Sequence, residues 1–121
     1  MGNLDAGGRI DAQVQAASAR ERQALAQYGL AVQNAFREVR DALVAQAKAR
    51  ERLDAENDRV AALRATLQLA RLRYQNGMTS QLELLDAERS LLAAEQNRID
   101  ALRAQRAAIA DLFRALGGTW S

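Results

Sequence analysis

The chain contains no cysteine, histidine or proline, and each absence excludes a class of chemistry or structure. Without cysteine there is no disulfide, thiol nucleophile or thiolate metal site. Without histidine the chain lacks the commonest metal ligand and the usual general base near neutral pH. The glycine pairs at 7–8 and 117–118 lack the lysine and the spacing of a phosphate-binding loop. We therefore predict that the chain is not an enzyme and has no catalytic residues, no cofactor and no metal.

Aromatic residues make up only 4% of the chain, so any core must be thin and built from leucine, valine, isoleucine and alanine. Alanine, leucine, arginine, glutamate and glutamine dominate, which is the composition of long helices and coiled coils. The 17 basic and 15 acidic residues alternate along the sequence. Alternating charge is typical of a solvated helix face and disfavours nucleic-acid binding.

Long hydrophobic runs are also absent. No stretch of about 18 apolar residues occurs, so we predict no membrane-spanning helix. Met1 and Gly2 lead directly into polar sequence without the features of a signal peptide. If the natural protein is exported, we expect this chain to be an internal piece of it.

The sequence therefore predicts an all-α chain that forms a long, antiparallel, coiled-coil-like helical hairpin. We expect a flexible lead-in over residues 1–9, where turn-forming residues gather, and a long helix over residues 10–75. A hairpin tip follows at residues 76–80, then a return helix over 81–116 and a C-terminal tail over 117–121. The short tip requires the two helices to lie antiparallel.

The long helix is predicted from apolar residues that recur every three or four positions, as in a coiled coil. The stretch 46–58 is the weakest part, because Leu53 is its only large apolar residue. If the helix breaks, we expect the break there. The positions that carry the period are Ile10, Val14, Ala17, Leu25, Tyr28, Val32, Ala35, Val39, Leu43, Leu53, Val60, Leu63, Leu67, Ala70 and Tyr74.

Local chemistry predicts where one helix ends and the next begins. Asn76 and Gly77 form a C-terminal cap in which glycine adopts a left-handed conformation. Ser80, followed three residues later by Glu83, forms a capping box at the start of the return helix. The apolar stripe of that helix runs through Leu82, Leu85, Leu92, Ile99, Leu102, Ile109, Phe113 and Leu116.

The two predicted helices differ in length. About 66 residues of helix extend roughly 100 Å, whereas about 35 residues extend roughly 50 Å. The return helix therefore covers only half of the first, and the apolar positions of residues 10–39 remain bare. An exposed stripe of that length needs a cover. Two alternatives remain open: self-association, or a break in the first helix that folds it back into a helical bundle.

Glu83 and Asp86 lie one helical turn apart and share one face. Two interpretations remain open for them. Acidic residues are favoured in the first turn by the helix dipole, which is a purely structural role. A functional role for the paired carboxylates is the alternative. Tyr74 fits an aromatic that closes the hairpin, and Thr79 and Ser80 fit turn residues.

Residues 73–91 resemble the tip motif RY-x-x-G-x-x-S-x-L-[DE]-[VL]-L-D-A-x-[RT]-x-L of the TolC-type outer-membrane efflux channels. The branch that partners resistance-nodulation-division pumps is the most similar. Supporting likenesses occur at residues 5–10 (DAGGRI), 35–43 (AFREVRDAL) and 116–120 (LGGTW), although Leu4 stands where the family usually has phenylalanine. The resemblance covers nearly the whole chain.

The resemblance implies a trimeric channel with a β-barrel in the outer membrane of a Gram-negative bacterium and a helical barrel in the periplasm. This chain would be the periplasmic hairpin of the second repeat, so any membrane contact would be made by barrel parts absent from it. Its tip, around Tyr74, Gly77, Met78, Thr79 and Ser80, would meet a periplasmic adaptor protein and, through the adaptor, an inner-membrane pump.

The same resemblance places the carboxylates that ring the closed pore at Glu83 and Asp86. A ring of such carboxylates disfavours anions, attracts cations and stores repulsion. Asp86 is the better gate candidate, because Glu83 also has a capping role. Position 79 is Thr where some members carry an arginine that contacts the gate, so this part of the gate network differs here.

Two alternative functions compete with the channel. The first is the coiled-coil hairpin of an adaptor protein, whose tip carries an Arg-x-x-x-Leu-x-x-x-x-x-x-Ser spacing that this chain lacks. The second is a generic coiled-coil interaction protein, which would explain the helices but would leave the tip motif to chance.

Overall fold

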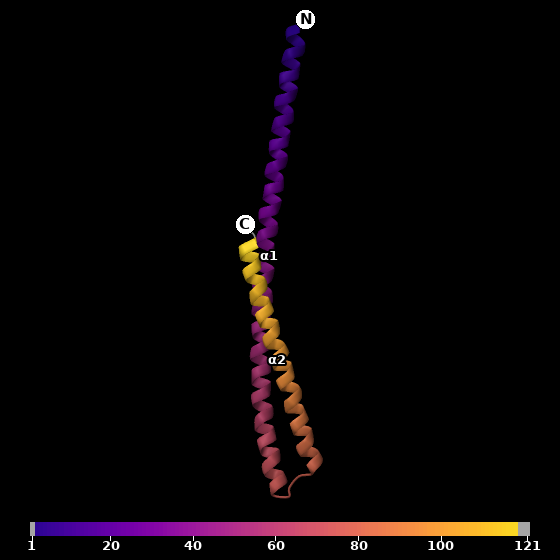
Figure 1. Ribbon diagram of the computed structural model, residues 1–121, viewed down its shortest axis with the longest axis vertical. Helices are drawn as coiled ribbons and strands as arrows, with labels where there is room; N and C mark the ends of the chain where they lie inside the picture. The colour runs from indigo at the N-terminus through magenta and orange to yellow at the C-terminus, as the bar shows by residue number, and fades with distance from the viewer. Residues whose placement is uncertain (1, 119–121) are drawn as a thin grey trace. The chain divides into compact units, whose positions relative to one another are not determined.

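The computed structural model describes the backbone of residues 2–118 and the side chains of residues 7–117. Helix α1 spans Gly2–Gln75 and helix α2 spans Gln81–Gly118, with a short turn between them (Figure 1). No strand occurs between residues 2 and 118. By its contacts the chain divides into two units, Met1–Glu38 and Val39–Ser121. The prediction of an all-α helical hairpin is confirmed.

Helix α1 is longer than the sequence predicted. It begins at Gly2, so the expected lead-in over residues 1–9 is helical from its second residue. The sequence favours turns at Gly7 and Gly8, but neither has a positive φ. A glycine costs only about 1 kcal/mol in a helix, and no proline is present to end it.

The possible break at residues 46–58 is not present either, because α1 continues through this stretch. The stretch is rich in alanine, arginine and glutamate, which favour helix without help from packing. A weak apolar pattern lowers the stabilisation that a helix gains by packing against another helix. It does not by itself end the helix. The fold-back into a bundle through such a break is therefore not what the structure shows.

Helix α2 starts at Gln81, where the sequence placed it, and continues to Gly118 rather than ending at Leu116. The glycines expected to open the C-terminal tail belong to the helix. The rest of that tail, residues 119–121 with Trp120, lies outside the described residues.

In the unit Val39–Ser121 the two helices pack antiparallel along a single line of contact, which we term the inner seam. Its positions alternate at three and four residues, the spacing of a coiled coil. Val60, Leu67, Ala94, Ala101 and Ala108 are buried. The half-buried positions of the inner seam are Ala42, Gln46, Ala49, Leu53, Glu56, Leu63 and Ala70 on α1 and Leu84, Ala87, Leu91, Gln105, Leu112 and Ala115 on α2.

The inner seam of α2 is not the stripe that the sequence indicated. Three alanines form its buried centre, whereas most of the large apolar residues of the predicted stripe are exposed. Alanine allows two helices to approach closely, so the row with the smallest side chains faces α1. The larger side chains occupy the next row, one residue later, which we term the outer row: Leu85, Leu92, Ile99, Leu102, Ile109, Phe113 and Leu116.

In the unit Met1–Glu38, the described side chains from residue 7 to residue 31 are all exposed. They include Ile10, Val14, Leu25 and Tyr28, each at least 60% exposed. The sequence predicted that this apolar stripe would lack a cover within the chain, and its exposure agrees. No helix in the described part of the chain is long and apolar enough to cross a membrane.

Candidate functional site at the hairpin tip

The turn between the helices is a Schellman motif centred on Gly77. The Met78 N–H donates to the Arg73 carbonyl at 2.7 Å, and the Gly77 N–H donates to the Tyr74 carbonyl at 3.0 Å. This pair of bonds requires a left-handed residue between them. Gly77 supplies it with a φ of 69°, the only positive φ in the described part of the chain. The predicted glycine cap is confirmed.

The side chain of Asn76 adds a further bond to the same turn. Its Nδ2 donates to the Leu72 carbonyl at 2.9 Å, and its backbone N–H donates to that carbonyl at 3.1 Å. Several of the last carbonyls of α1 are thus satisfied within the turn, although the turn is exposed. The hairpin therefore ends in a defined geometry.

The start of α2 is capped by Ser80. Its Oγ accepts a hydrogen bond from the Glu83 N–H at 3.2 Å, which is the first half of the predicted capping box. The second half is absent, because in the described part of the chain the Glu83 carboxylate makes no hydrogen bond to the Ser80 N–H. The Glu83 carboxylate is therefore available for another role.

Glu83 and Asp86 are both exposed and line one shallow groove of about 310 Å³ between the helices. Arg73, Thr66 and Ser90 line the same groove. Neither carboxylate forms an ion pair within the described residues. The structure thus brings the two predicted carboxylates together beside one arginine and leaves both charges open to solvent.

Arg73 was not assigned to the site from the sequence. It is the basic residue in the last turn of α1, and Glu83 is the acidic residue in the first turn of α2. Only the antiparallel arrangement places the two residues on one groove. The opposite charges on either side of the turn are visible in the sequence. Placing Arg73 next to the carboxylates, however, requires knowing the register in which the two helices pair.

The remaining predicted tip residues present a mixed surface. Met78 is 69% exposed and Tyr74 is 42% exposed. Thr79 is half-buried, and its Oγ1 is buried without a hydrogen-bond partner. Tyr74 and Met78 thus leave two large side chains open to solvent beside the capped turn.

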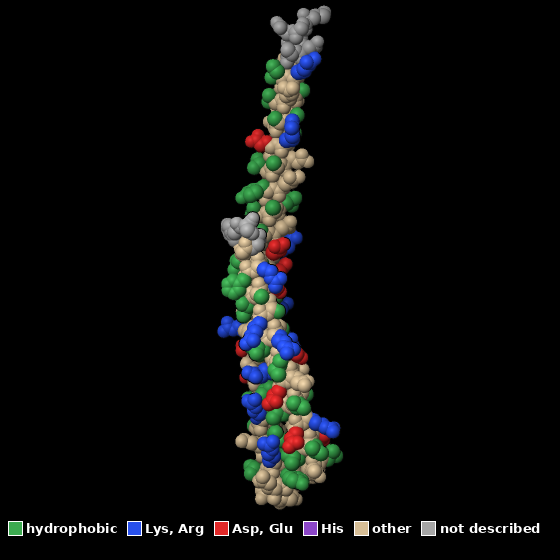
Figure 2. Space-filling model, in the orientation of Figure 1, with side chains coloured by type: hydrophobic (Ala, Val, Ile, Leu, Met, Phe, Trp, Pro, Cys, Tyr) green, Lys and Arg blue, Asp and Glu red, His purple; other side chains and the backbone are tan. Residues whose placement is uncertain are grey.

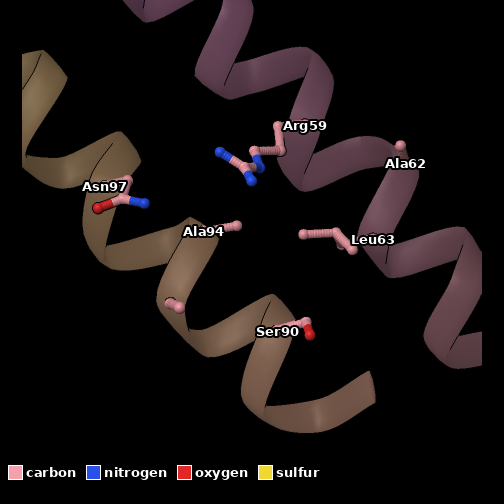
Figure 3. A pocket seen from close by; sticks show the side chains of 7 residues that line it. Arg59, Ala62, Leu63, Ser90, Ala94 and Asn97 are labelled. Atoms are coloured by element: carbon pink, nitrogen blue, oxygen red, sulfur yellow. The ribbon is translucent and has the colours of Figure 1, made fainter. Parts of the chain in front are cut away.

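A second groove, of about 380 Å³, continues away from the tip on the same face (Figure 3). Leu63 and Ala94 project toward one another across it, and Arg59 and Asn97 lie toward one end. The two grooves share Leu63 and Ser90. The two grooves therefore adjoin along one face of the hairpin.

The opposite face holds the polar bridges between the helices. Arg98 Nε donates to Asn57 Oδ1 at 2.6 Å, and Arg64 pairs with Glu95 at 3.5 Å. Asn57, Arg64 and Glu95 each follow an inner-seam position by one residue, whereas Arg98 lies between the inner-seam residues Ala94 and Ala101. These bridges join residues that lie at matching levels of the two helices.

In the part of the chain that the structure describes, no group of three or more histidine, cysteine, aspartate or glutamate residues is placed to hold a metal ion. What the tip offers is a capped turn, two carboxylates and exposed side chains.

Comparison with known proteins identifies the family. A profile described as outer membrane efflux protein matches residues 3–118. The chain belongs to the outer membrane efflux protein family. The resemblance found in the tip motif is thereby confirmed over almost the whole chain.

Individual relatives agree with this assignment. The chain is 42% identical over 113 residues to the cation efflux system protein CusC of Escherichia coli O6:H1, covering 93% of this chain and 25% of that protein. It is 41% identical over 114 residues to the outer membrane protein OprJ of Pseudomonas aeruginosa, covering 94% of this chain and 24% of that protein. The chain therefore spans about a quarter of the length of these relatives.

Solved structures show the same fold. A crystal structure of CusC matches with a TM-score of 0.75 at 42% identity, over 79% of this chain and 27% of that one. A membrane protein from Pseudomonas aeruginosa matches with a TM-score of 0.68 at 40% identity, over 91% of this chain and 25% of that one. The helical hairpin is thus the fold of a segment within larger membrane proteins. The relatives carry the names of efflux proteins rather than enzymes.

Proposed function

We propose that this chain is the periplasmic helical hairpin of a trimeric outer-membrane export channel. The observation that carries the proposal is the 42% identity to CusC over 93% of the chain, together with the capped turn at Gly77. The named relatives include a cation efflux protein and a toluene efflux pump protein. Because these cargoes differ, we propose export as the function and assign no exported substrate.

The channel would stand in the outer membrane of a Gram-negative bacterium, with this segment in the periplasm. The names of the relatives support that location, since SilC of Salmonella typhimurium is described as a probable outer membrane lipoprotein. In this arrangement the hairpin provides wall and tip, and the membrane is crossed by other parts of the protein.

Glu83 and Asp86 are proposed to contribute to the gate at the tip. Three copies of the hairpin around one axis would place up to six carboxylates in a ring. Such a ring favours cations over anions. The exposure of both carboxylates and their lack of ion pairs within the described residues support this role. Asp86 has no capping function, so it is the stronger candidate.

The turn itself is proposed to bind a periplasmic adaptor protein, which connects the channel to an inner-membrane pump. Support comes from the exposed Tyr74 and Met78 on either side of the rigid Gly77. Thr79 and Ser80 complete this surface.

The test is a chimera in which residues 7–117 of this chain replace the matching stretch of E. coli CusC. We expect a strain without its own CusC to regain cation export when it carries the chimera. A chimera that reaches the outer membrane as a trimer but does not restore export would refute the proposal.

The gate is tested in the same chimera by conductance in planar bilayers. Asp86→Asn is expected to lower cation selectivity and to increase the time spent open, because the ring loses charge and repulsion. Asp100→Asn removes a carboxylate of α2 away from the tip and serves as the control. Equal effects of the two variants would remove Asp86 from the gate.

A further inference from the structure

Arg73 lies across a groove from the two carboxylates of the tip. Arg73 on α1 and Glu83 and Asp86 on α2 line the same groove of about 310 Å³. All three side chains are exposed, and none of them forms an ion pair within the described residues. One face of the tip therefore combines two negative charges with one positive charge, and all three remain open to solvent.

A bonded pair further along the hairpin shows that Arg73 lies at the level of Asp86. Arg64 reaches Glu95 at 3.5 Å, so these two residues share one level of the hairpin. Arg73 is nine residues nearer the tip on α1, and Asp86 is nine residues nearer the tip on α2. Nine residues make about two and a half helical turns, so the same combination of charges recurs on the opposite face. Figure 2 shows basic and acidic side chains close together over this half of the hairpin.

The two combinations differ in how the positive charge is used. Arg64 is bound to one carboxylate, whereas Arg73 stands beside two carboxylates without an ion pair to either in the described part of the chain. The Coulomb energy falls only with the first power of the distance. A guanidinium group in this position therefore lowers the negative potential at both carboxylates.

We propose that Arg73 is a specificity-determining residue of the channel, because its charge limits how strongly the tip carboxylates attract cations. The inference rests on the proposed function, in which copies of Glu83 and Asp86 form a ring at the tip. Each hairpin that adds two carboxylates to the ring also adds one guanidinium group beside them. Such a ring favours cations less strongly than its carboxylates alone would.

A purely structural role for Arg73 has to be separated from this one. Arg73 is the basic residue in the last turn of α1, where a cation interacts favourably with the helix dipole. Its backbone carbonyl accepts the Met78 N–H, and a change of side chain leaves that bond in place. Loss of the dipole interaction would lower stability without changing the attraction of cations to the carboxylates. The tests therefore measure that attraction.

The first test uses the full chain, with manganese(II) chloride as the probe. Mn²⁺ is paramagnetic and broadens the NMR signals of nearby nuclei, so the broadening of the amide signals of residues 83–86 reports the local concentration of cations. Arg73→Gln is expected to increase this broadening about twofold at low ionic strength. The increase should disappear in about 1 M salt, where the screening length is about 3 Å. Arg73→Lys keeps the charge and should match the unaltered chain.

Arg71→Gln is the matched control. Arg71 is also exposed near the end of α1, but it lines a separate hollow with Gln68 and Gln75. Its replacement removes the same charge two residues away along the chain and should leave the broadening at residues 83–86 nearly unchanged. If Arg71→Gln increases the broadening as much as Arg73→Gln does, the effect is one of net charge and the inference is overturned. Circular dichroism of every variant checks that helix content is unchanged.

The second test measures ion selectivity in the chimera with CusC. The reversal potential in a gradient of potassium chloride across a planar bilayer gives the ratio of cation to anion permeability. Arg73→Gln is expected to raise this ratio about twofold, whereas Asp86→Asn is expected to lower it. Arg71→Gln again serves as the control and should leave the ratio close to that of the unaltered chimera.

The outcomes distinguish this inference from the proposed function. If a trimeric chimera ignores both Asp86→Asn and Arg73→Gln, the carboxylate gate and the inference fail together. If Asp86→Asn lowers the permeability ratio but Arg73→Gln leaves it unchanged, the inference alone is overturned. Unchanged Mn²⁺ broadening in Arg73→Gln also overturns the inference alone. Opposite shifts for the two variants, with Arg71→Gln close to the unaltered chimera, support it.

Discussion

Gly77 offers the sharpest test of the hairpin, because its backbone conformation rather than its surroundings forbids a side chain. Nothing lies within 4 Å of a Cβ added at Gly77, so alanine would meet no steric obstacle. Its φ of 69° nevertheless belongs to the left-handed region, where an L-residue costs about 1–2 kcal/mol. Alanine also lowers the conformational entropy of the unfolded chain, which offsets about 0.4–1 kcal/mol of this cost. We expect Gly77→Ala to lower the free energy of unfolding by roughly 1 kcal/mol.

Gly29 provides the matched control for this substitution. It too has nothing within 4 Å of an added Cβ, but it lies inside α1 without a positive φ. Gly29→Ala is therefore expected to raise helix stability by about 1 kcal/mol. The two variants add the same methyl group and should change stability in opposite directions. Gly77→Asn should lie between Gly77→Ala and the unaltered chain, since asparagine tolerates the left-handed region.

The assay is urea unfolding followed by the helical circular dichroism signal, with all chains at one concentration so that self-association contributes equally. Opposite shifts of the unfolding midpoint for Gly77→Ala and Gly29→Ala support the left-handed turn. If Gly77→Ala unfolds at the same urea concentration as the unaltered chain, or at a higher one, the reasoning is wrong.

Three further substitutions test the cap, the inner seam and a polar bridge by the same unfolding measurement. Ser80→Ala removes the acceptor of the Glu83 N–H and should cost about 1 kcal/mol, whereas Ser80→Asp should retain most of the stability. Ala101→Leu forces a larger side chain into a fully buried position and should cost about 1–3 kcal/mol, while the same change at the exposed Ala107 should be nearly neutral. Arg98→Ala removes the 2.6 Å bond to Asn57 and, because that bond is exposed, should cost no more than about 1 kcal/mol; a larger loss would show that the bridge is essential to the register.

Features determined by local chemistry could be predicted from the sequence. The turn was located because Asn76, Gly77 and Ser80 each have a conformational preference that acts within a few residues. The periodic apolar positions of α1 likewise predicted a helix that continues to Gln75. Both inferences require only neighbours along the chain.

Features that depend on packing were predicted less well. The large residues of α2 were expected to mark the contact with α1, but Ala94 and Ala101 are buried while Leu92 is exposed. Side-chain size indicates how much area can be buried but not which of two adjacent rows allows the closer approach. Arg73 was not predicted as a site residue for a related reason. It lines the same groove as Glu83 only because of the register of the two helices across the turn.

The N-terminal error has a different origin. The sequence favours turns at Gly7 and Gly8, yet α1 includes both residues. Glycine permits a turn without requiring one, and its cost in a helix is small beside the cooperativity of a long helix.

The five-residue turn between Gln75 and Gln81 also bears on the order in which the hairpin forms. Contacts next to the turn join residues close in sequence, whereas the contact of Ala108 with α1 closes a loop of many tens of residues. The entropy cost of closing a loop grows with the length of the loop. Contacts between the helices should therefore form first at the tip and then progressively further from it. Substitutions near Gly77 should then slow folding, and substitutions near Ala108 should mainly speed unfolding.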